Sequence, residues 1–254
     1  MPLVIDKNIS IFKIRTIWFS NRPYDEKGVD RIVHMYCKEK VDAEGFMRET
    51  LSTLVIDLTK GLDQVWNDMD GDCRKKIRRA EKEGFKFNTN TNYREFIQME
   101  KDFRKNKKMP PYDTRIMENS EEYVKKYGTL FTAELNGQQL CCYLAIHDDK
   151  YMMGLQAASR RLETDEYLRK MIGFGNRMLV WEAIKYADSK GICQYDLGGY
   201  YAEETLDPEM EGINRFKRGF GGHLNERHSY FKDYSISLKA ARKATAIWNR
   251  INRH

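Results

Sequence analysis

The chain is short of cysteine and of long apolar runs, and each shortage excludes a class of protein. Its five cysteines cannot all pair, and Cys141 and Cys142 are neighbours inside an apolar stretch. A disulfide framework is therefore not expected, nor is a zinc site, because no Cys-x-x-Cys spacing occurs. We expect buried, reduced thiols instead. The longest apolar runs, such as Leu140–Ile146 and Leu54–Ile56, are far shorter than the roughly 20 residues of a membrane-spanning helix.

Targeting signals and the common hydrolase motifs are missing too. The first residues carry Asp6 and Lys7 and no long apolar stretch, so we expect no signal peptide and a cytoplasmic location. The five histidines are scattered, and the sequence holds neither a His-Glu-x-x-His motif nor a Ser-His constellation. We therefore expect no metal site and no tightly bound cofactor.

What remains is an ordinary globular composition. Of the 254 residues, 41% are hydrophobic and 32% are charged, which excludes a disordered or fibrous chain and is enough for one large domain or two small ones. The formal net charge of +6 permits an anionic partner, such as a phosphate-bearing ligand or RNA, without requiring one.

The first half combines short β-branched runs with amphipathic helices. Two prolines within Lys107–Tyr112 interrupt regular structure, so we expect a boundary between an N-terminal part, residues 1–108, and a C-terminal domain, residues 109–254. The predicted elements of the first half are strands at Ser10–Ser20 and Ser52–Leu58, one continuous helix at Leu62–Lys82 and a helix at Asn92–Lys105.

The second half opens with the clearest β pattern in the chain, a three-stranded meander. Its first two strands are joined by Asn136-Gly137, a favoured hairpin turn. Three antiparallel strands followed by a helix and further strands is the order of a GNAT-type core. The expected fold is therefore α/β (α+β), with a mixed, mostly antiparallel sheet flanked by helices. The predicted elements are a short helix at Glu121–Lys126, strands at Thr129–Leu135, Gln138–His147 and Lys150–Ala158, a charged loop at Ser159–Lys170, a helix at Gly175–Lys190, strands at Cys193–Leu197 and His223–Tyr230, and a helix at Ser237–Asn252.

Two segments resemble the FemABX peptidyltransferases. The first is Cys73–Phe85, CRKKIRRAEKEGF, which closes a helix with an Ala-Glu-Lys-x-Gly phrase. The second is Leu179–Gly222, where LVWEAIKYADSKGICQYDLGG is followed, after a loop, by GINRFKRGFGG. FemABX enzymes carry two GNAT-like domains and take an amino acid from aminoacyl-tRNA rather than from CoA. Because this chain is shorter, the resemblance implies one GNAT-like acyltransferase domain after a trimmed GNAT-like half.

The same resemblance implies a catalytic lysine. In the FemABX pattern the lysine of the Phe-Lys phrase stabilises the transition state with the backbone of the preceding residue, which implies these roles for Lys217 and Phe216. Acyl transfer to an amine passes through a tetrahedral oxyanion, and one donor facing it lowers the barrier by roughly 3–4 kcal/mol. The alternative is that Lys217 is one of 44 basic residues on a solvated surface.

Asp196 is the second catalytic candidate. It precedes two glycines at the end of a predicted strand, where backbone can approach a ligand closely. It could orient the attacking amine or accept its proton. The alternative is an aspartate that hydrogen-bonds its own turn.

Two further groups are candidate binding residues. The stretch from Lys170 to Gly175 partly matches the Arg/Gln-x-x-Gly-x-Gly/Ala loop that holds the CoA pyrophosphate at a helix N-terminus in GNAT enzymes. The cofactor candidates are Lys170, Gly173, Gly175 and Asn176. The substrate candidates, near two strand ends, are Gln156, Ser159, Arg160, Arg161, Tyr195 and Gly199; for Tyr195 the alternative is a place in the core.

Basic residues gather at three places. The first place is one face of the helix expected at Leu62–Lys82. This face could hold nucleotide or tRNA phosphates, or be a solvated face balanced by Glu81 and Glu83. A second cluster has the same two interpretations. In the C-terminal helix, basic residues lie opposite an apolar stripe that either packs on the domain or touches an anionic membrane surface. The three sets are Arg74, Lys75, Arg78, Arg79 and Lys82; Arg104, Lys105, Lys107 and Lys108; and Arg242, Lys243 and Arg250.

Together these features predict an acyltransferase that moves an aminoacyl or acyl group to an amine of a cell-envelope or nucleotide-linked precursor. The donor is expected to be aminoacyl-tRNA or acyl-CoA, and the acceptor to be anionic and phosphate-bearing. Two alternatives stay open. One is an acyl-CoA-dependent N-acyltransferase, for example on an amino sugar; the other is a non-catalytic GNAT-like module that binds RNA or a partner.

Overall fold

The computed structural model describes residues 1–108, 126–162, 164–203 and 205–242. The chain forms two compact units, one of Met1–Ser52 with the residues from Glu226 onward, the other of Thr53–Asn225. Strands β4 (Met47–Asp57) and β10 (His223–Asp233) each pass from one unit into the other.

This division differs from the boundary expected near residue 108. Strand β5 (Lys86–Thr89) precedes that point and β6 (Gly128–Leu135) follows it, yet the two strands pair antiparallel within the second unit. The prolines therefore interrupt regular structure inside a unit. Tertiary pairing, which local composition does not reveal, decides where the units separate.

The first unit contains β1 (Leu3–Ile9), β2 (Phe12–Trp18) and β3 (Arg31–Cys37), followed in the sheet order by β10. The first two strands form an antiparallel hairpin, β2 runs parallel to β3, and β3 pairs antiparallel with β10. The strand expected at Ser10–Ser20 is confirmed as β2, and the last predicted strand is confirmed as part of β10.

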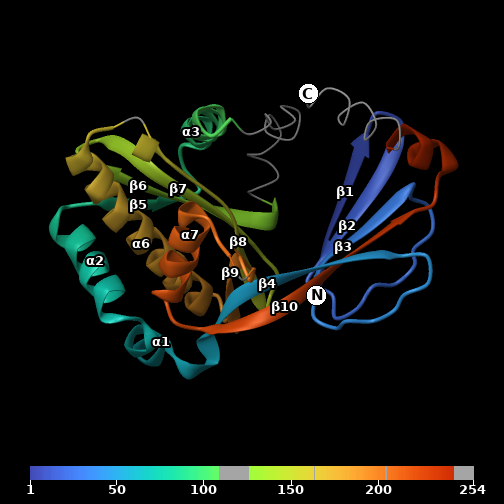
Figure 1. Ribbon diagram of the computed structural model, residues 1–254, viewed down its shortest axis with the longest axis horizontal. Coiled ribbons are helices and arrows are strands. Elements are labelled where there is room, and N and C mark those ends of the chain that lie inside the picture. The colour runs from blue at the N-terminus through green and yellow to red at the C-terminus, as the bar shows by residue number, and fades with distance from the viewer. Residues whose placement is uncertain (109–125, 163, 204, 243–254) are drawn as a thin grey trace. The chain divides into compact units, whose positions relative to one another are not determined.

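The second unit is a sheet in the order β4-β9-β8-β7-β6-β5 (Figure 1). The predicted meander is confirmed as β6, β7 (Gln138–His147) and β8 (Tyr151–Ser159), which are consecutive neighbours and antiparallel. Asn136 and Gly137, at φ of 54° and 79°, form the turn because these two residue types tolerate left-handed backbone. Strand β9 (Gln194–Tyr200) then adds parallel to β8.

Helices cover both faces of this sheet. Along β7, Cys141, Tyr143 and Ala145 belong to the larger core, which includes α6 (Glu166–Ser189), whereas Cys142 and Leu144 belong to a smaller core with α3 (Tyr93–Asn106). Alternate residues of a strand point to opposite faces, so α6 and α3 lie on opposite sides of the sheet. The expected mixed, mostly antiparallel sheet flanked by helices is confirmed.

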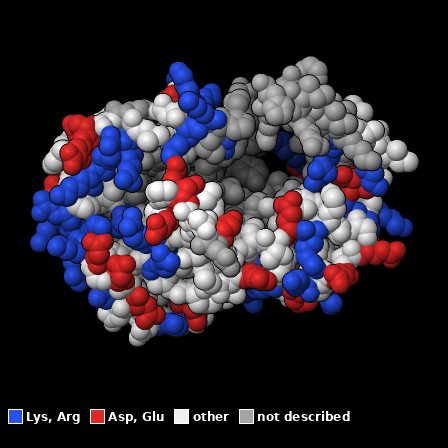
Figure 2. Space-filling view, in the orientation of Figure 1, with Lys and Arg blue, Asp and Glu red and all other residues white. Residues whose placement is uncertain are grey.

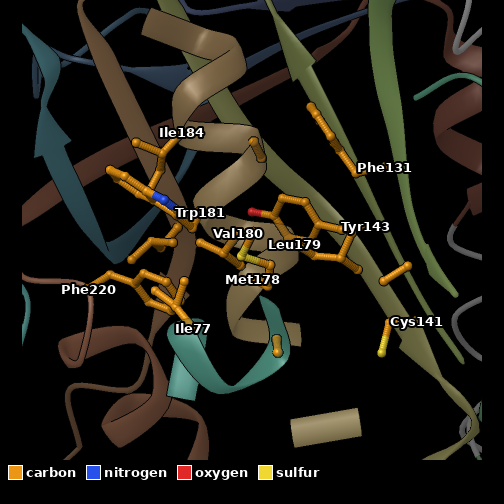
Figure 3. Close-up of a cluster of buried hydrophobic side chains, with 14 of the residues drawn as sticks. Ile77, Phe131, Cys141, Tyr143, Met178, Leu179, Val180, Trp181, Ile184 and Phe220 are labelled. Atoms are coloured by element: carbon orange, nitrogen blue, oxygen red, sulfur yellow. The ribbon is translucent and has the colours of Figure 1, made fainter. Parts of the chain in front are cut away.

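The larger core fixes the segment that carries the FemABX-like phrase. Phe220 is fully buried and follows the Gly219 cap of helix α7 (Pro208–Arg218), so it anchors the end of that helix. Fully burying a side chain of this size is worth about 1.5–3 kcal/mol. Figure 3 shows it among buried side chains of α6, of α2 (Gly71–Lys82) and of the sheet: Ile77, Phe131, Cys141, Tyr143, Met178, Leu179, Val180, Trp181 and Ile184.

The single helix expected at Leu62–Lys82 is wrong. A short 3-10 turn η1 (Leu58–Lys60) leads into α1 (Leu62–Asp68), Met69 is extended, and α2 starts anew at Gly71. The physical reason is Asp70, whose carboxylate accepts a hydrogen bond from the Cys73 amide at 2.6 Å and so caps α2. The apolar spacing continues through the break, which is why periodicity alone merges the two helices.

The start of α6 also differs from the prediction. The helix begins at Glu166 rather than Gly175, so the loop expected at Ser159–Lys170 is reduced to the 3-10 turn η2 (Arg160–Leu162) and a short link. Asp165 caps the helix by accepting from the Leu168 amide at 2.7 Å. The two glycines that favoured a loop are tolerated inside the helix.

The remaining predictions are partly covered by the structure. The helix expected at Asn92–Lys105 is confirmed as α3, and residues 236–242 begin the expected C-terminal helix. The helix expected at Glu121–Lys126 lies outside the described residues except for its last residue, and so does the rest of the C-terminal helix with Lys243 and Arg250. Within the described ranges, no helix is both long and apolar enough to cross a bilayer.

Candidate functional site

The site begins where two parallel strands stop pairing. Strands β8 and β9 pair at three positions, Tyr151 with Gln194, Met152 with Tyr195, and Met153 with Asp196. Just beyond, the register of β8 against β7 shifts between Gly154 and Gln156, which leaves one extra residue in β8. A bulge of this kind bends a strand and ends its pairing. The later residues of β9 therefore turn to partners other than β8.

Asp196 forms the turn that redirects β9. Its side chain is 0% exposed, and one carboxylate oxygen accepts the Gly198 amide at 2.7 Å while the other accepts the Tyr151 hydroxyl. Gly198 has a φ of +77°, and a Cβ there would come within 3.1 Å of the Gly154 carbonyl oxygen. Position 198 therefore requires glycine. The interpretation of Asp196 as an aspartate that hydrogen-bonds its own turn is the one that the structure supports, because a fully buried carboxylate offers no surface to an incoming amine.

Lys217 meets this turn from helix α7. The helix starts at an Asp207 cap that accepts the Glu209 and Met210 amides, with Pro208 in its first turn, and it carries Lys217 in its last turn. The half-buried Lys217 ammonium donates to the carbonyl oxygen of Gly199. Burial lowers the pKa of Lys217 to about 8, against the opposing effect of the Asp196 charge.

The residues around Lys217 hold its helix in place. Phe216 packs on the core at 5.3 Å from the Phe220 ring, and the Arg177 guanidinium of α6 lies 5.0 Å from the Phe216 ring centroid. Arg177 also donates to the Gly173 carbonyl at 3.0 Å. The residue before the lysine is thus clamped between core and guanidinium, which fixes the backbone from which Lys217 extends.

Two site residues were not predicted. Asn214 is 2% exposed; its amide donates to the Tyr201 carbonyl at 2.8 Å and accepts the Tyr201 amide at 3.1 Å, which ties the segment after β9 to α7. The sequence offered a signal for Asn214, because it is a polar residue that directly follows Ile213 among the apolar residues of an amphipathic helix. Tyr151 gave none, because its contact with Asp196 depends on strand pairing.

Among the described residues, the predicted substrate residues other than Gly199 form no hydrogen bond with Lys217 that would place them around it. Tyr195 is 0% exposed and donates to the Tyr143 hydroxyl at 2.9 Å, so it is a core residue, and its assignment to substrate binding is wrong. Arg160 is an ion-pair partner of Glu95 and donates to the Gln139 carbonyl at 3.2 Å. Its guanidinium therefore joins η2 to α3 and β7.

Gln156, Ser159 and Arg161 lie along the end of β8 and in η2. Gln156 is half-buried next to Glu100 of α3; burial raises the pKa of Glu100, whereas Gln156 and Arg104 lower it. Ser159 is half-buried and paired with Cys141, and Arg161 is exposed. Gly199 is the residue of this set that contacts Lys217.

The expected pyrophosphate loop is wrong in its conformation. Lys170, Gly173, Gly175 and Asn176 all lie inside α6, where backbone amides serve the helix, rather than at its N-terminus. A Cβ on Gly175 would come within 2.8 Å of the Phe85 ring, so this glycine permits close packing. The true N-terminus carries Asp165 and Glu166, whose negative charges oppose a bound phosphate.

The basic face on α2 is smaller than predicted. Arg74 donates to the Trp66 and Asn67 carbonyls at the end of α1, and Arg79 pairs with Glu83. Lys75, Arg78 and Lys82 are exposed on one side of the helix, and the Arg78 guanidinium lies 5.4 Å from the Trp66 ring centroid. Figure 2 shows Lys and Arg gathered at the end of the second unit where α2 lies. In the second cluster, Arg104 pairs with Glu100 and Lys107 with Glu209.

A pocket of about 350 Å³ lies elsewhere in the second unit. It is lined by β5, by Phe131 of β6 and by the later turns of α6, including Glu182, Lys185 and Tyr186. Neither Lys217 nor Asp196 belongs to its lining. The pocket and the lysine are therefore separate features of the same unit.

Solved structures resemble the fold of this chain closely enough to classify it. FemX matches with a TM-score of 0.65 at 14% sequence identity, covering 94% of this chain and 85% of that one. The fold is FemABX-like and GNAT-type. L-PGS from Bacillus licheniformis matches with a TM-score of 0.52 at 9% identity, covering 94% of this chain and 83% of that one. A conserved protein of unknown function from Bacteroides thetaiotaomicron VPI-5482 matches with a TM-score of 0.54 at 9% identity, covering 91% and 83%.

No family model and no curated protein matches the sequence. The FemX-like fold is thus visible in three dimensions and in the two short phrases of the sequence, Cys73–Phe85 and Leu179–Gly222, but not in overall sequence identity. At 14% identity the likeness to FemX establishes the fold. The chemistry has to be argued from the residues themselves.

Proposed function

We propose that the chain is an aminoacyltransferase that moves an aminoacyl group to an amine of a cell-envelope or nucleotide-linked precursor. The observation that carries the proposal is the Lys217 ammonium, which is half-buried on α7 and donates to a carbonyl oxygen, that of Gly199. A desolvated cation held toward a carbonyl is the feature that amine attack on an ester needs. The FemX-like fold and the Phe-Lys phrase of the sequence support the same assignment.

In the proposed reaction, the acceptor amine attacks the ester carbonyl of the donor. A carbon–nitrogen bond forms while the carbonyl oxygen becomes an oxyanion, and Lys217 leaves the Gly199 carbonyl to donate to that oxyanion. The ester carbon–oxygen bond then breaks, and the proton lost by the amine passes to the departing ribose oxygen. One donor of this kind is worth roughly 10²–10³ in rate.

The donor that the site supports best is aminoacyl-tRNA. The N-terminus of α6 presents Asp165 and Glu166 where a GNAT enzyme would hold the CoA pyrophosphate. The exposed Lys75, Arg78 and Lys82 of α2 offer phosphate-binding cations instead. Aminoacyl-tRNA is a cytoplasmic molecule, so we propose that the protein acts in the cytoplasm. We also propose that its acceptor is anionic and carries phosphate.

The test is a transfer assay with two radiolabelled donors. Purified chain is incubated with bulk aminoacyl-tRNA or with acetyl-CoA, together with a panel of amine-bearing nucleotide-sugar and muropeptide precursors. We expect transfer from aminoacyl-tRNA, with K217M at least about 100-fold slower. K217R is the matched control, because it keeps a cation on a long side chain.

Three outcomes would count against the proposal. Turnover with acetyl-CoA and none with aminoacyl-tRNA would replace it with an acyl-CoA-dependent N-acyltransferase. A K217M rate within a few-fold of the wild type would remove the lysine from the chemistry. Tight RNA binding without transfer to any acceptor would favour a non-catalytic binding module.

A further inference from the structure

We infer that Asp196 and Tyr151 form a positioning pair for Lys217: they hold the turn at which the pairing of β8 with β9 ends, aim the Gly199 carbonyl at the lysine and set a negative charge facing its ammonium. Neither side chain needs to touch the substrate for this role. The inference rests on the proposed function only in what it says about rate. Its structural and electrostatic content concerns the chain alone.

The first step is how the pair holds the turn where β9 stops pairing with β8. Met153 and Asp196 form the last pair of β8 with β9, and two residues later the Gly198 amide donates back to the Asp196 carboxylate at 2.7 Å. An amide that bonds the side chain of its own turn is not available to the neighbouring strand. The Tyr151 hydroxyl, donated across from the first paired position of β8, holds the second carboxylate oxygen.

The second step is where the freed backbone points. With Gly198 at a φ of +77°, the next carbonyl, that of Gly199, accepts the Lys217 ammonium. A Cβ on Gly198 would lie 3.8 Å from the Lys217 Nζ, so the turn itself runs beside the ammonium. The Asp196 carboxylate holds the Gly198 amide and thus fixes the position of the next carbonyl, that of Gly199. This carbonyl is the group that Lys217 contacts before substrate binds.

The third step is charge. Burial lowers the pKa of Lys217, and the Asp196 charge is the one that raises it again. The other charged groups near the end of α7 face different residues: Arg177 of α6 lies over Phe216, the Asp70 carboxylate of α2 lies next to Gly219, and Arg218 donates to the Tyr200 hydroxyl. Asp196 therefore favours the protonated form of an ammonium that burial disfavours.

The decisive measurement is the Lys217 pKa in the folded chain, which needs no substrate. Protein labelled with ¹³C at the lysine ε-carbons is titrated by NMR from about pH 6 to about pH 11, and the Lys217 signal is identified by its loss in K217R. We expect D196N to lower this pKa by roughly one unit; it keeps the size, and its amide oxygen can still accept the Gly198 amide while its amide nitrogen donates to the Tyr151 hydroxyl. The matched control is E100Q, which neutralises another buried carboxylate of the same unit.

E100Q should leave the Lys217 pKa within about 0.3 unit of the wild type, because Glu100 is not among the charges that act on it. A D196N value within the same margin would overturn the electrostatic part of the inference. This result is independent of the proposed function. The pKa measurement tests the electrostatic part of the inference even if no donor or acceptor is identified.

Kinetics test the positioning part. In D196N the alkaline limb of the rate profile should move to lower pH by the same amount as the NMR pKa, a shift that a merely structural defect would not produce. Y151F keeps the charge and removes one hydrogen bond, so we expect kcat to fall about 10-fold with the limb unmoved. A wild-type rate in Y151F would overturn the role of Tyr151. Should D196N fail to fold, Y151F carries the test.

Discussion

At the scale of single residues, the site depends on a lysine that the fold keeps partly out of water. Burial lowers the pKa of Lys217 to about 8, so the ammonium form that can donate to an oxyanion predominates below that pH and disappears above it. A solvated surface lysine, the alternative interpretation of the sequence, would not show this. The protonation state of one side chain therefore sets the working range of the proposed reaction.

The first prediction concerns the pH dependence of transfer. The wild-type rate should be level below about pH 8 and fall above it with the loss of one proton, because the donating form is lost. In K217R this limb should vanish, since an arginine stays protonated up to a pH of about 12. Initial rates of transfer are measured from about pH 6 to about pH 9.5. Hydrolysis of the donor ester without enzyme is measured at the same pH values as the background. An unchanged alkaline limb in K217R would assign that proton to another group.

The same burial should cost stability. The unfolded chain holds the Lys217 proton with the ordinary pKa of 10.5, whereas the folded chain holds it with a pKa of about 8. Between these values the unfolded state binds more protons, so the free energy of unfolding contributed by Lys217 rises with pH across that window. At pH 7 the full cost of the half-buried ammonium is present.

The second prediction follows from this sign. K217M should be at least as stable as the wild type at about pH 7, and its advantage should shrink as the pH rises from about 8 toward 10.5. Urea unfolding followed by circular dichroism at pH values on either side of this window measures the difference. A K217M chain that is less stable at neutral pH, by an amount independent of pH, would contradict the argument.

At the scale of elements, α6 offers a sharp comparison between two glycines of one helix. Gly173 has nothing within 4 Å of the position where a Cβ would lie, whereas a Cβ on Gly175 would come within 2.8 Å of the Phe85 ring. Both residues lie well inside Glu166–Ser189. Helix propensity favours alanine over glycine, and steric contact opposes it at one of the two positions.

The third prediction uses this pair. G173A should stabilise the chain by about 0.5–1 kcal/mol, the usual gain for alanine over glycine inside a helix. G175A should destabilise it by about 1–3 kcal/mol, the usual range for overpacking a core, because the added methyl meets an aromatic ring. Urea unfolding midpoints measure both. Destabilisation by G173A would mean that the segment needs a glycine conformation and would restore the loop expected from the sequence.

The elements that sequence patterns predict well are those whose determinants are local. The meander β6–β8 was predictable because its apolar runs lie within the strands and Asn136-Gly137 lies in the turn that joins two of them. The start of α6 was not, because Gly173 and Gly175 resemble a loop, and the Phe85 ring that favours glycine at position 175 is distant in sequence. The break between α1 and α2 depends on one capping aspartate, Asp70, within an uninterrupted apolar spacing.

The site was predictable to the same extent. The Phe-Lys phrase identified Lys217, and the glycines after Asp196 identified the turn that it meets. The contact of Tyr151 with Asp196 was beyond reach, since it arises from parallel pairing of strands that helix α6 separates in the sequence. The ion pair of Arg160 with Glu95 was beyond reach for the same reason, because it joins elements far apart in the chain.

At the scale of the whole molecule, charge is distributed unevenly rather than in large excess. The formal net charge is only +6, yet Lys and Arg gather where α2 lies (Figure 2). Of this basic face, Arg74 and Arg79 are hydrogen-bonded or ion-paired within the chain, whereas Lys75, Arg78 and Lys82 are exposed, with the Arg78 guanidinium over the Trp66 ring. If the donor is a tRNA, these three are the cations of α2 that its phosphates would meet.

The last prediction separates this local effect from net charge. The triple variant K75E/R78E/K82E and the control K13E/K38E/K40E, which alters exposed lysines of the first unit, each change three side chains by two charges, so both take the formal charge from +6 to 0. We expect the α2 variant to weaken binding of bulk tRNA at least about 10-fold and to reduce the salt dependence of log K by about 2–3 in slope, because three phosphate contacts are lost. The control should weaken binding only slightly. Anisotropy titrations at several salt concentrations measure both, and equal losses in the two variants would mean that tRNA responds to overall charge and that α2 is a solvated face.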